Sequence, residues 1–386
     1  MGCRFECHIY QDDENNIIDF RGSGGNSSNK QEDLIIQSNL LNQNEKEIKL
    51  NKIKNNLQNK LSEIGIFIPI NEFKPLINPK INEYMQTNKL DIQNLLPSNI
   101  STFKPGPIKF KNNIIYNGSW NKNYQMEGQG IIYIPERKII AEGLWLQGNI
   151  IYGRIFFPNG DIYEGKMKNS LPDGEGKLNF ANGESYEGDF KKGEMTGQGI
   201  FIFSDKTIYI GDIEKGLFNG KGKMKWDNGT EYEGTFADSS LSGEGIIFNS
   251  YQNESYQGMF EKNEFNWNGI YYYKNGDIYK GNFEFGIKRG NGKYIKGNEQ
   301  IIFNGIWNAD LPNGNGIITY KGNSLKGFWR NGIYIEDKEI EENINDNFYN
   351  ICKDIIPLQN SIIPNSLPHL SSNDSNVSKL YPENFI

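Results

Sequence analysis

A short phrase that returns at a fixed step most constrains how this 386-residue chain folds. An aromatic residue is followed two positions later by glycine, and a Gly-x-Gly pair comes next, as in Tyr163-Glu-Gly165 with Gly174-Glu-Gly176. The lead aromatic residues stand at 163, 186, 209, 232, 256, 279 and 303, so the step is 23 or 24 residues. A fixed period of roughly 20–50 residues indicates an architecture of stacked repeats.

Each repeat has the pattern of two short strands. Residues two apart share one face of a strand, so Tyr163, Gly165 and Met167 point one way and the charged residues between them point the other. Asn-Gly often precedes the lead tyrosine, as at Asn159-Gly160, and Asn-Gly between strand-like runs is a strong hairpin signal. The sequence therefore predicts a chain of β-hairpins.

Glycine weakens a strand, so glycines at a fixed place within the strands need their own reason. A glycine leaves a dent on the sheet, and we expect an aromatic ring from the neighbouring strand to fill it. The first repeat glycines are Gly165, Gly188, Gly211, Gly234, Gly258, Gly281 and Gly305. The lead aromatics either fill these dents or line a groove for a helix or peptide: Tyr163, Tyr186, Tyr209, Tyr232, Tyr256, Tyr279 and Phe303.

Tyr-x-Gly-x-aromatic followed by Gly-x-Gly at this step resembles the MORN repeat. The resemblance implies a mainly β fold, an elongated single twisted antiparallel sheet of stacked hairpins over residues 116–335, with short flanking helices. Three copies depart from the pattern. Ala141-Glu-Gly143 lacks the lead tyrosine, Trp267 replaces the first glycine before Gly269, and the copy at Leu325 is truncated.

The flanks have different compositions. Residues 1–30 read as a flexible tether and 31–115 as a helical and irregular segment, with helices expected at 31–62 and 81–96. After the repeats, apolar residues at helical spacing predict a capping helix over 337–356, within a segment 336–357. The remainder, 358–386, has the Ser/Asn/Pro-rich composition of a disordered tail.

The first residues suggest a lipid anchor. Gly2 would accept myristate once Met1 is removed, and Cys3 and Cys7 stand where S-acylation occurs, although Glu6 departs from the preferred Ser or Thr. Two lipid signals are what stable attachment requires. The alternative is a disordered start that happens to place glycine beside cysteine.

Catalytic and metal chemistry have few candidates. The two histidines, His8 and His369, lie in the predicted tails, so the sequence predicts no enzyme, no metal site and no cofactor. The repeated Gly-x-Gly lacks the strand-then-helix context of a phosphate loop. A net charge of −7 argues against nucleic acid as a partner.

The resemblance and the composition together predict a non-enzymatic scaffold. It would dock other proteins at the inner face of a membrane, the cell cortex, or a cilium or flagellum. Two alternatives stay open: the repeats bind acidic phospholipids such as phosphoinositides, or the chain is a regulatory subunit of an enzyme bound in trans.

Overall fold

The structure, a computed structural model, describes residues 59–63, 65–73, 79–92, 95, 102–297 and 301–335, together with Lys52 and Asn55. Gly2, Cys3 and Cys7, the predicted tether, the capping helix and the tail lie outside these residues. So does most of the helix predicted over 31–62, of which Lys52, Asn55 and residues 59–62 are described and are helical.

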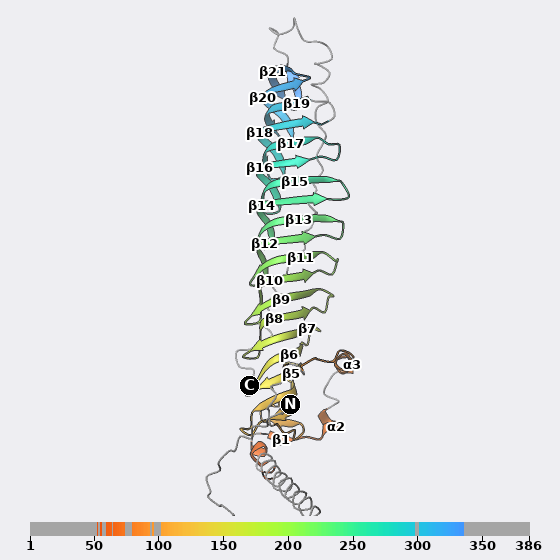
Figure 1. Ribbon diagram of the computed structural model, residues 1–386, viewed down its shortest axis with the longest axis vertical. Helices are drawn as coiled ribbons and strands as arrows, with labels where there is room; N and C mark the ends of the chain where they lie inside the picture. The colour runs from red at the N-terminus through yellow and green to blue at the C-terminus, as the bar shows by residue number, and fades with distance from the viewer. Residues whose placement is uncertain are drawn as a thin grey trace, which may run out of the picture. The chain divides into compact units, whose positions relative to one another are not determined.

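The described chain forms a 22-stranded antiparallel sheet in which every strand pairs with the next one in sequence (Figure 1). The prediction of a mainly β chain in one open antiparallel sheet is confirmed. The strands are β1 Gly65–Phe67, β2 Ile108–Phe110, β3 Ile115–Trp120, β4 Met126–Ile134, β5 Ile139–Leu146, β6 Asn149–Phe156, β7 Ile162–Lys168, β8 Leu171–Asn179, β9 Ser185–Lys191, β10 Glu194–Ile202, β11 Ile208–Glu214, β12 Leu217–Lys225, β13 Thr230–Ala237, β14 Ser240–Asn249, β15 Glu254–Glu261, β16 Glu264–Tyr272, β17 Ile278–Glu284, β18 Ile287–Lys296, β19 Ile301–Asn308, β20 Leu311–Tyr320, β21 Asn323–Arg330 and β22 Ile333–Ile335.

The sheet begins earlier than the repeats do. β1 pairs with β2, and β2 pairs with β3, so two strands of the segment expected to be helical and irregular extend the sheet. Helices α2 (Ile70–Phe73) and α3 (Pro79–Thr87) lie between β1 and β2 in the sequence. The second predicted helix, 81–96, is shorter than expected because Thr87 and Asn88 end it. The Asn88 side chain donates to the Tyr84 carbonyl (3.1 Å) and the Thr87 hydroxyl to the Glu83 carbonyl (2.8 Å).

One face of the sheet carries a continuous core along its length. The lead aromatic rings are fully buried there, with exposures of 0–1%. The ring of Tyr163 covers a pair of glycines in register, Gly165 on its own strand and Gly176 on the next, and a Cβ at either would come within 2.5 Å of the tyrosine hydroxyl. The prediction of a ring from the neighbouring strand is therefore right for Gly176, whereas the ring over Gly165 belongs to the same strand.

The tyrosine hydroxyls are satisfied within this core. Tyr163 donates to the Lys166 carbonyl at 2.6 Å, and five further lead tyrosines donate to the carbonyl three residues on. Burial raises the pKa of Tyr163 well above its usual range, so the hydroxyl stays a neutral donor. Of the two roles considered for the lead aromatics, the structure places them in the glycine dents, away from solvent.

Two kinds of turn join the strands, and they differ in which residues have positive φ. At the Asn-Gly connections only the glycine has positive φ (Gly160, 98°), and the asparagine side chain accepts from the N–H two residues on, Asp161 N–H at 3.1 Å. This geometry differs from the two-residue turn that Asn-Gly most often forms. The tighter connections have positive φ at two consecutive residues, as at Asn169 (51°) and Ser170 (60°).

The first glycine of each Gly-x-Gly pair stands at a break in the strand register. Gly174 and Gly220 have φ of 99° and 108°, a region that L side chains rarely adopt. Register shifts lie beside them, for example between Gly165 and Met167 on the paired strand. Trp267 occupies the same place with φ of 58° and a ring that is 63% exposed.

Candidate functional site

The second face of the sheet, called the open face below, carries the alternate residues of each strand. Pairing of successive strands places its side chains in two rows that cross the sheet. Both rows lie between the glycine pairs and the Asn-Gly connections. One row contains Glu142, Arg154, Glu164, Lys177, Glu187, Ile200, Ile210, Lys223, Glu233 and Ile246. The other contains Ile140, Phe156, Ile162, Asn179, Ser185, Ile202, Ile208, Lys225, Glu231 and Phe248.

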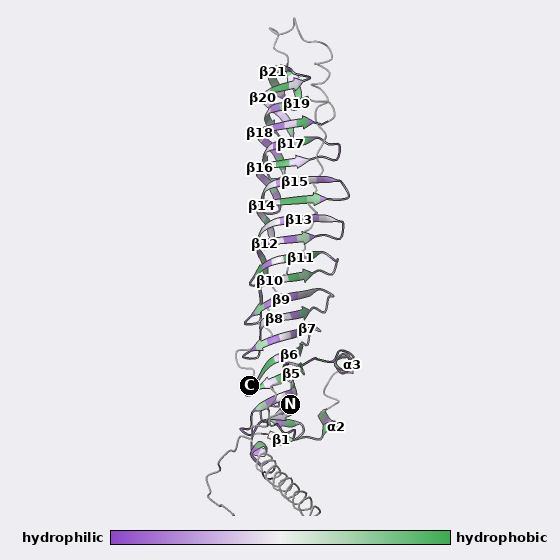
Figure 2. Cartoon of the chain, in the orientation of Figure 1, coloured by the Kyte–Doolittle hydropathy of each residue, from purple (hydrophilic) through white to green (hydrophobic). Residues whose placement is uncertain are grey.

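The side chains of the open face change in character along the sheet; Figure 2 colours each strand by the hydropathy of its residues, those of both faces together. From β7 to β9 its residues are mostly charged and polar, and Lys166–Glu175 and Lys177–Glu187 form ion pairs at 2.7 and 3.6 Å. On β10 and β11 four isoleucines face one another in register: Ile200 pairs with Ile210, and Ile202 with Ile208. We call these four residues the isoleucine cluster.

Hollows in the protein surface follow this face. A groove of about 1210 Å³ is lined by residues from the end of α3 and from strands β6 to β11. A second hollow of about 430 Å³ lies beyond it, between the isoleucine cluster and Ile246 with Phe248. The walls of this second hollow include two ion pairs, Lys223–Glu233 at 2.9 Å and Lys225–Glu231 at 2.6 Å.

The isoleucine cluster is exposed although it is apolar. Ile200, Ile202 and Ile210 keep 40–49% of their surface, and so do Ile246 and Phe248 across the second hollow. Exposed apolar side chains gathered on one surface of a soluble protein commonly mark a place where another molecule binds. The exposed part of the open face is therefore a groove with an apolar lining.

The chain itself covers the beginning of the open face. Ile81, Tyr84 and Met85 of α3 pack against a second core cluster that contains Ile140 and Phe156. The ring of Tyr84 meets Phe156 edge-on, with centroids 6.0 Å apart. An amphipathic helix thus occupies on β3–β7 the rows that lie open on β10–β14.

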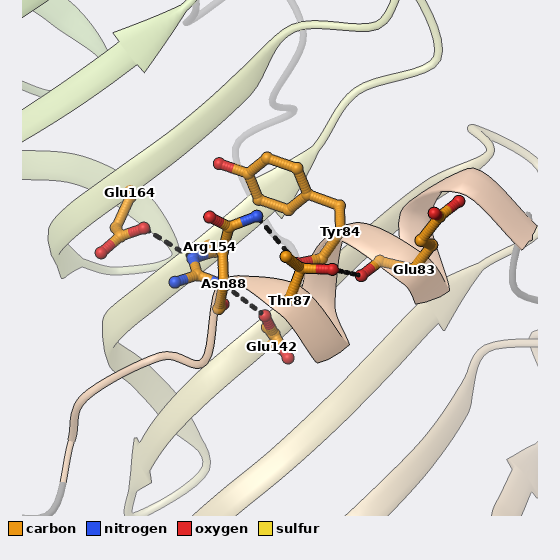
Figure 3. Close-up of polar contacts among 7 residues, drawn as sticks. All are labelled: Glu83, Tyr84, Thr87, Asn88, Glu142, Arg154 and Glu164. Carbon is orange, nitrogen blue, oxygen red and sulfur yellow. Dashed lines mark hydrogen bonds and ion pairs between the residues drawn. The ribbon is translucent and has the colours of Figure 1, made fainter.

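A buried arginine fastens the end of α3 to the sheet (Figure 3). Arg154 is 3% exposed and donates through Nε to Glu164 at 2.6 Å, and its Nη1 lies 3.4 Å from Glu142. Nη1 also donates to the carbonyl of Asn88, just after α3, and the guanidinium stands 5.7 Å from the Tyr84 ring. Burial raises the pKa of Glu142 to about 7, although Arg154 acts in the opposite direction.

Sequence reasoning missed this arrangement. The residues singled out for a groove were the lead aromatics, which lie on the core face, while the isoleucines that line the groove of the open face were passed over. Their signal was present, because Ile200, Ile202, Ile208 and Ile210 alternate with core aromatics on two adjacent strands. The contact between Arg154 and Asn88 spans 66 residues and has no sequence signature.

The described residues contain neither a metal-binding cluster nor a spanning helix. No group of three or more His, Cys, Asp or Glu side chains among them is placed to hold a metal ion. Among the same residues, no helix has the length and apolar character to cross a membrane.

Solved structures resemble the chain only distantly. The TCP10 domain of Danio rerio CPAP is 12% identical, covering 48% of this chain and 86% of that one, with a TM-score of 0.29. The TCP10c domain of Drosophila melanogaster Sas-4 is also 12% identical, covering 46% and 91%, with a TM-score of 0.22. No curated protein matches the chain.

A family model for the MORN repeat matches six segments: 163–185, 186–208, 209–231, 256–278, 279–299 and 303–324. The repeat at Tyr232 falls between two matches, yet its ring covers Gly234 and Gly245 in the same way. Residues 163–324 therefore contain six MORN repeats, and the chain is a MORN-repeat protein.

Proposed function

We propose that the chain is a non-enzymatic docking scaffold that binds an amphipathic helix or peptide of a partner protein on its open face. The isoleucine cluster, Ile246 and Phe248 would receive the apolar side of this segment. One observation carries the proposal: α3 of the chain itself lies on the same two rows of the sheet, and the groove continues from its end.

The charges of the groove support a protein partner over an acidic phospholipid. Lys166, Lys177, Lys223 and Lys225 each lie beside a glutamate at 2.6–3.6 Å. Anionic lipid surfaces are bound by clusters of basic residues that keep a net positive charge. A groove with alternating signs suits a helix that carries charges of both signs along its flanks.

The experiment uses a display library of amphipathic helical peptides selected against the full chain. We expect the selected peptides to lose at least tenfold in affinity for an Ile210→Asp variant, because a carboxylate would be buried at the apolar contact. Tyr251→Asp is the matched control, since Tyr251 is 88% exposed at a turn outside the groove. If the selected peptides bind Ile210→Asp as tightly as the parent, the groove is not the docking site.

Placement at a membrane or the cytoskeleton is part of the same proposal and rests on the sequence. Gly2→Ala should move most of the protein to the soluble fraction, because it removes the acceptor for myristate. Cell fractionation measures this, with Glu6→Gln as the control that leaves the acceptor in place. If both variants fractionate as the parent does, the lipid anchor is wrong and attachment depends on a docked partner.

A further inference from the structure

The stretch of the open face that α3 covers is apolar. Beneath the helix, Ile140 is 3% exposed and Phe156 is 1% exposed, and Ile131 and Ile162 pack against the same cluster. These side chains project from strands β4 to β7, which the sheet holds in place independently of α3. Phe73 of α2 is 2% exposed and belongs to the same cluster, so α2 and α3 together cover these side chains, and removal of α3 would expose part of them.

The helix itself buries little of its surface. α3 has nine residues and none of its side chains is fully buried. A helix of this length is not stable alone in water and depends on what it packs against. Its contacts with the sheet include the three half-buried side chains of Ile81, Tyr84 and Met85 and the hydrogen bond from Arg154 to the Asn88 carbonyl.

Arg154 determines which end of a bound helix lies at this side of the site. Its Nη1 reaches a carbonyl one residue beyond the end of α3, where the last carbonyls of a helix lack partners within the helix. The partial negative charge at a helix C-terminus favours a cation at this place. The site therefore receives the C-terminal end of a helix at Arg154 and the apolar side of its preceding turns on Ile140 and Phe156.

We propose that α3 is a displaceable occupant of a helix-binding site, and that an amphipathic helix of a partner protein replaces it on β3–β7. The incoming helix has apolar residues at the spacing of Ile81, Tyr84 and Met85 and ends against Arg154. This inference deepens the proposed function, because it makes α3 a regulator of the same open face. Release of α3 extends the docking groove from the isoleucine cluster back to the first strands.

The test uses a labelled synthetic peptide of residues 79–92 and the full chain. In a Tyr84→Ala/Met85→Ala variant the resident helix loses its main contacts, so the added peptide should bind at least tenfold more tightly than it binds the parent. Fluorescence anisotropy measures this. Asn82→Ala/Gln86→Ala is the matched control, because both residues are exposed on α3, and it should exclude the peptide as the parent does. Equal binding to the parent and to the contact variant would overturn the proposal.

Hydrogen exchange of the unaltered chain gives a second readout that does not depend on a variant. The amides of α3 should exchange at least a hundredfold faster than those of β5 and β6, since the helix detaches while the sheet persists. If α3 and these strands exchange together, the helix does not leave separately and the proposal is wrong.

A third experiment distinguishes failure of the α3 proposal from failure of the proposed docking at the isoleucine cluster. Adding Ile210→Asp to the Tyr84→Ala/Met85→Ala variant should leave binding of the 79–92 peptide unchanged, because Ile210 lies beyond the α3 site. If that peptide binds and no library peptide depends on Ile210, the displaceable helix stands and docking at the isoleucine cluster falls. Loss of 79–92 binding with Ile210→Asp would show that the peptide occupies the isoleucine cluster and would overturn the α3 site.

Discussion

At the scale of single residues, the paired glycines account for the repeat. Each lead ring lies across two glycines in register, and each lead tyrosine also donates to a carbonyl of its own strand, so ring and glycines are needed together. The φ of Gly211 and Gly222 is ordinary, so a side chain is excluded there by lack of room and not by the backbone conformation. The positive φ of Gly220 is a separate requirement.

Gly211→Val should destabilise the fold by about 1–3 kcal/mol, the usual cost of overpacking. A Cβ at Gly211 would stand 2.5 Å from the Gly222 Cα and the Lys221 carbonyl oxygen. Glu214→Gln is the control on the same strand, where the side chain is exposed. Thermal unfolding compares the two, and equal melting temperatures would contradict the role given to the glycine pair.

A lysine occupies one position that is apolar in other repeats. Lys288 pairs across the strands with Phe283, where Phe218 and Phe265 pair with Ile213 and Phe260. It is fully buried, its Nζ has no hydrogen-bond partner, and the nearest carboxylate oxygen, on Asp310, is 3.8 Å away. Burial lowers the pKa of Lys288 to about 8.

Lys288→Met should therefore raise the free energy of unfolding by about 1–3 kcal/mol at pH 7. Because the folded pKa lies below the usual 10.5, the unfolded chain binds more protons between about pH 8 and 10.5. The buried tyrosines, whose pKa is raised, are the same in parent and variant, so the difference in stability between the two proteins reports Lys288. The advantage of the variant should shrink as the pH rises across this window. Chemical denaturation of both proteins at pH 7 and pH 10 measures this difference; an advantage independent of pH would contradict the buried charge.

At the scale of elements, the sequence predicted the hairpins because their cause is local. Tyr163, Gly165 and the next Gly-x-Gly specify strands, face and turn within one repeat. It did not predict the attachment of α3, because Tyr84 and Phe156 meet only when the sheet has formed. The length of α3 depended on side-chain hydrogen bonds at Thr87 and Asn88, which a pattern of apolar residues does not report.

The attachment of α3 should depend on pH through Glu142. Its pKa is about 7 beneath the helix segment and returns toward 4.5 when water reaches it, so the attached state binds more protons between these values. After correction for intrinsic rates, the amides of α3 should be better protected from hydrogen exchange at pH 6 than at pH 8. Glu142→Gln should flatten this difference, while the exposed Glu175→Gln should preserve it. A difference that survives in Glu142→Gln would assign the effect to another group.

At the scale of the whole sheet, each strand contacts mainly its two neighbours, so stability is close to a sum of local terms. Gly316→Val places a side chain 2.7 Å from the Phe303 ring near one end of the sheet. Hydrogen exchange should then show lost protection in β19–β22 with β7–β12 unchanged. A uniform loss over all strands would mean that the sheet unfolds as one cooperative unit.

The pairing of each strand with its successor also has a consequence for synthesis. A strand that leaves the ribosome finds its partner already formed and only a short loop away, so folding can follow the growing chain. The exception is β1, since Ile66 pairs with Lys109 and must wait for more than forty residues to be made. The segment that carries α3 is the loop closed by that pairing, so α3 reaches its place on the sheet after the strands beneath it have been synthesised.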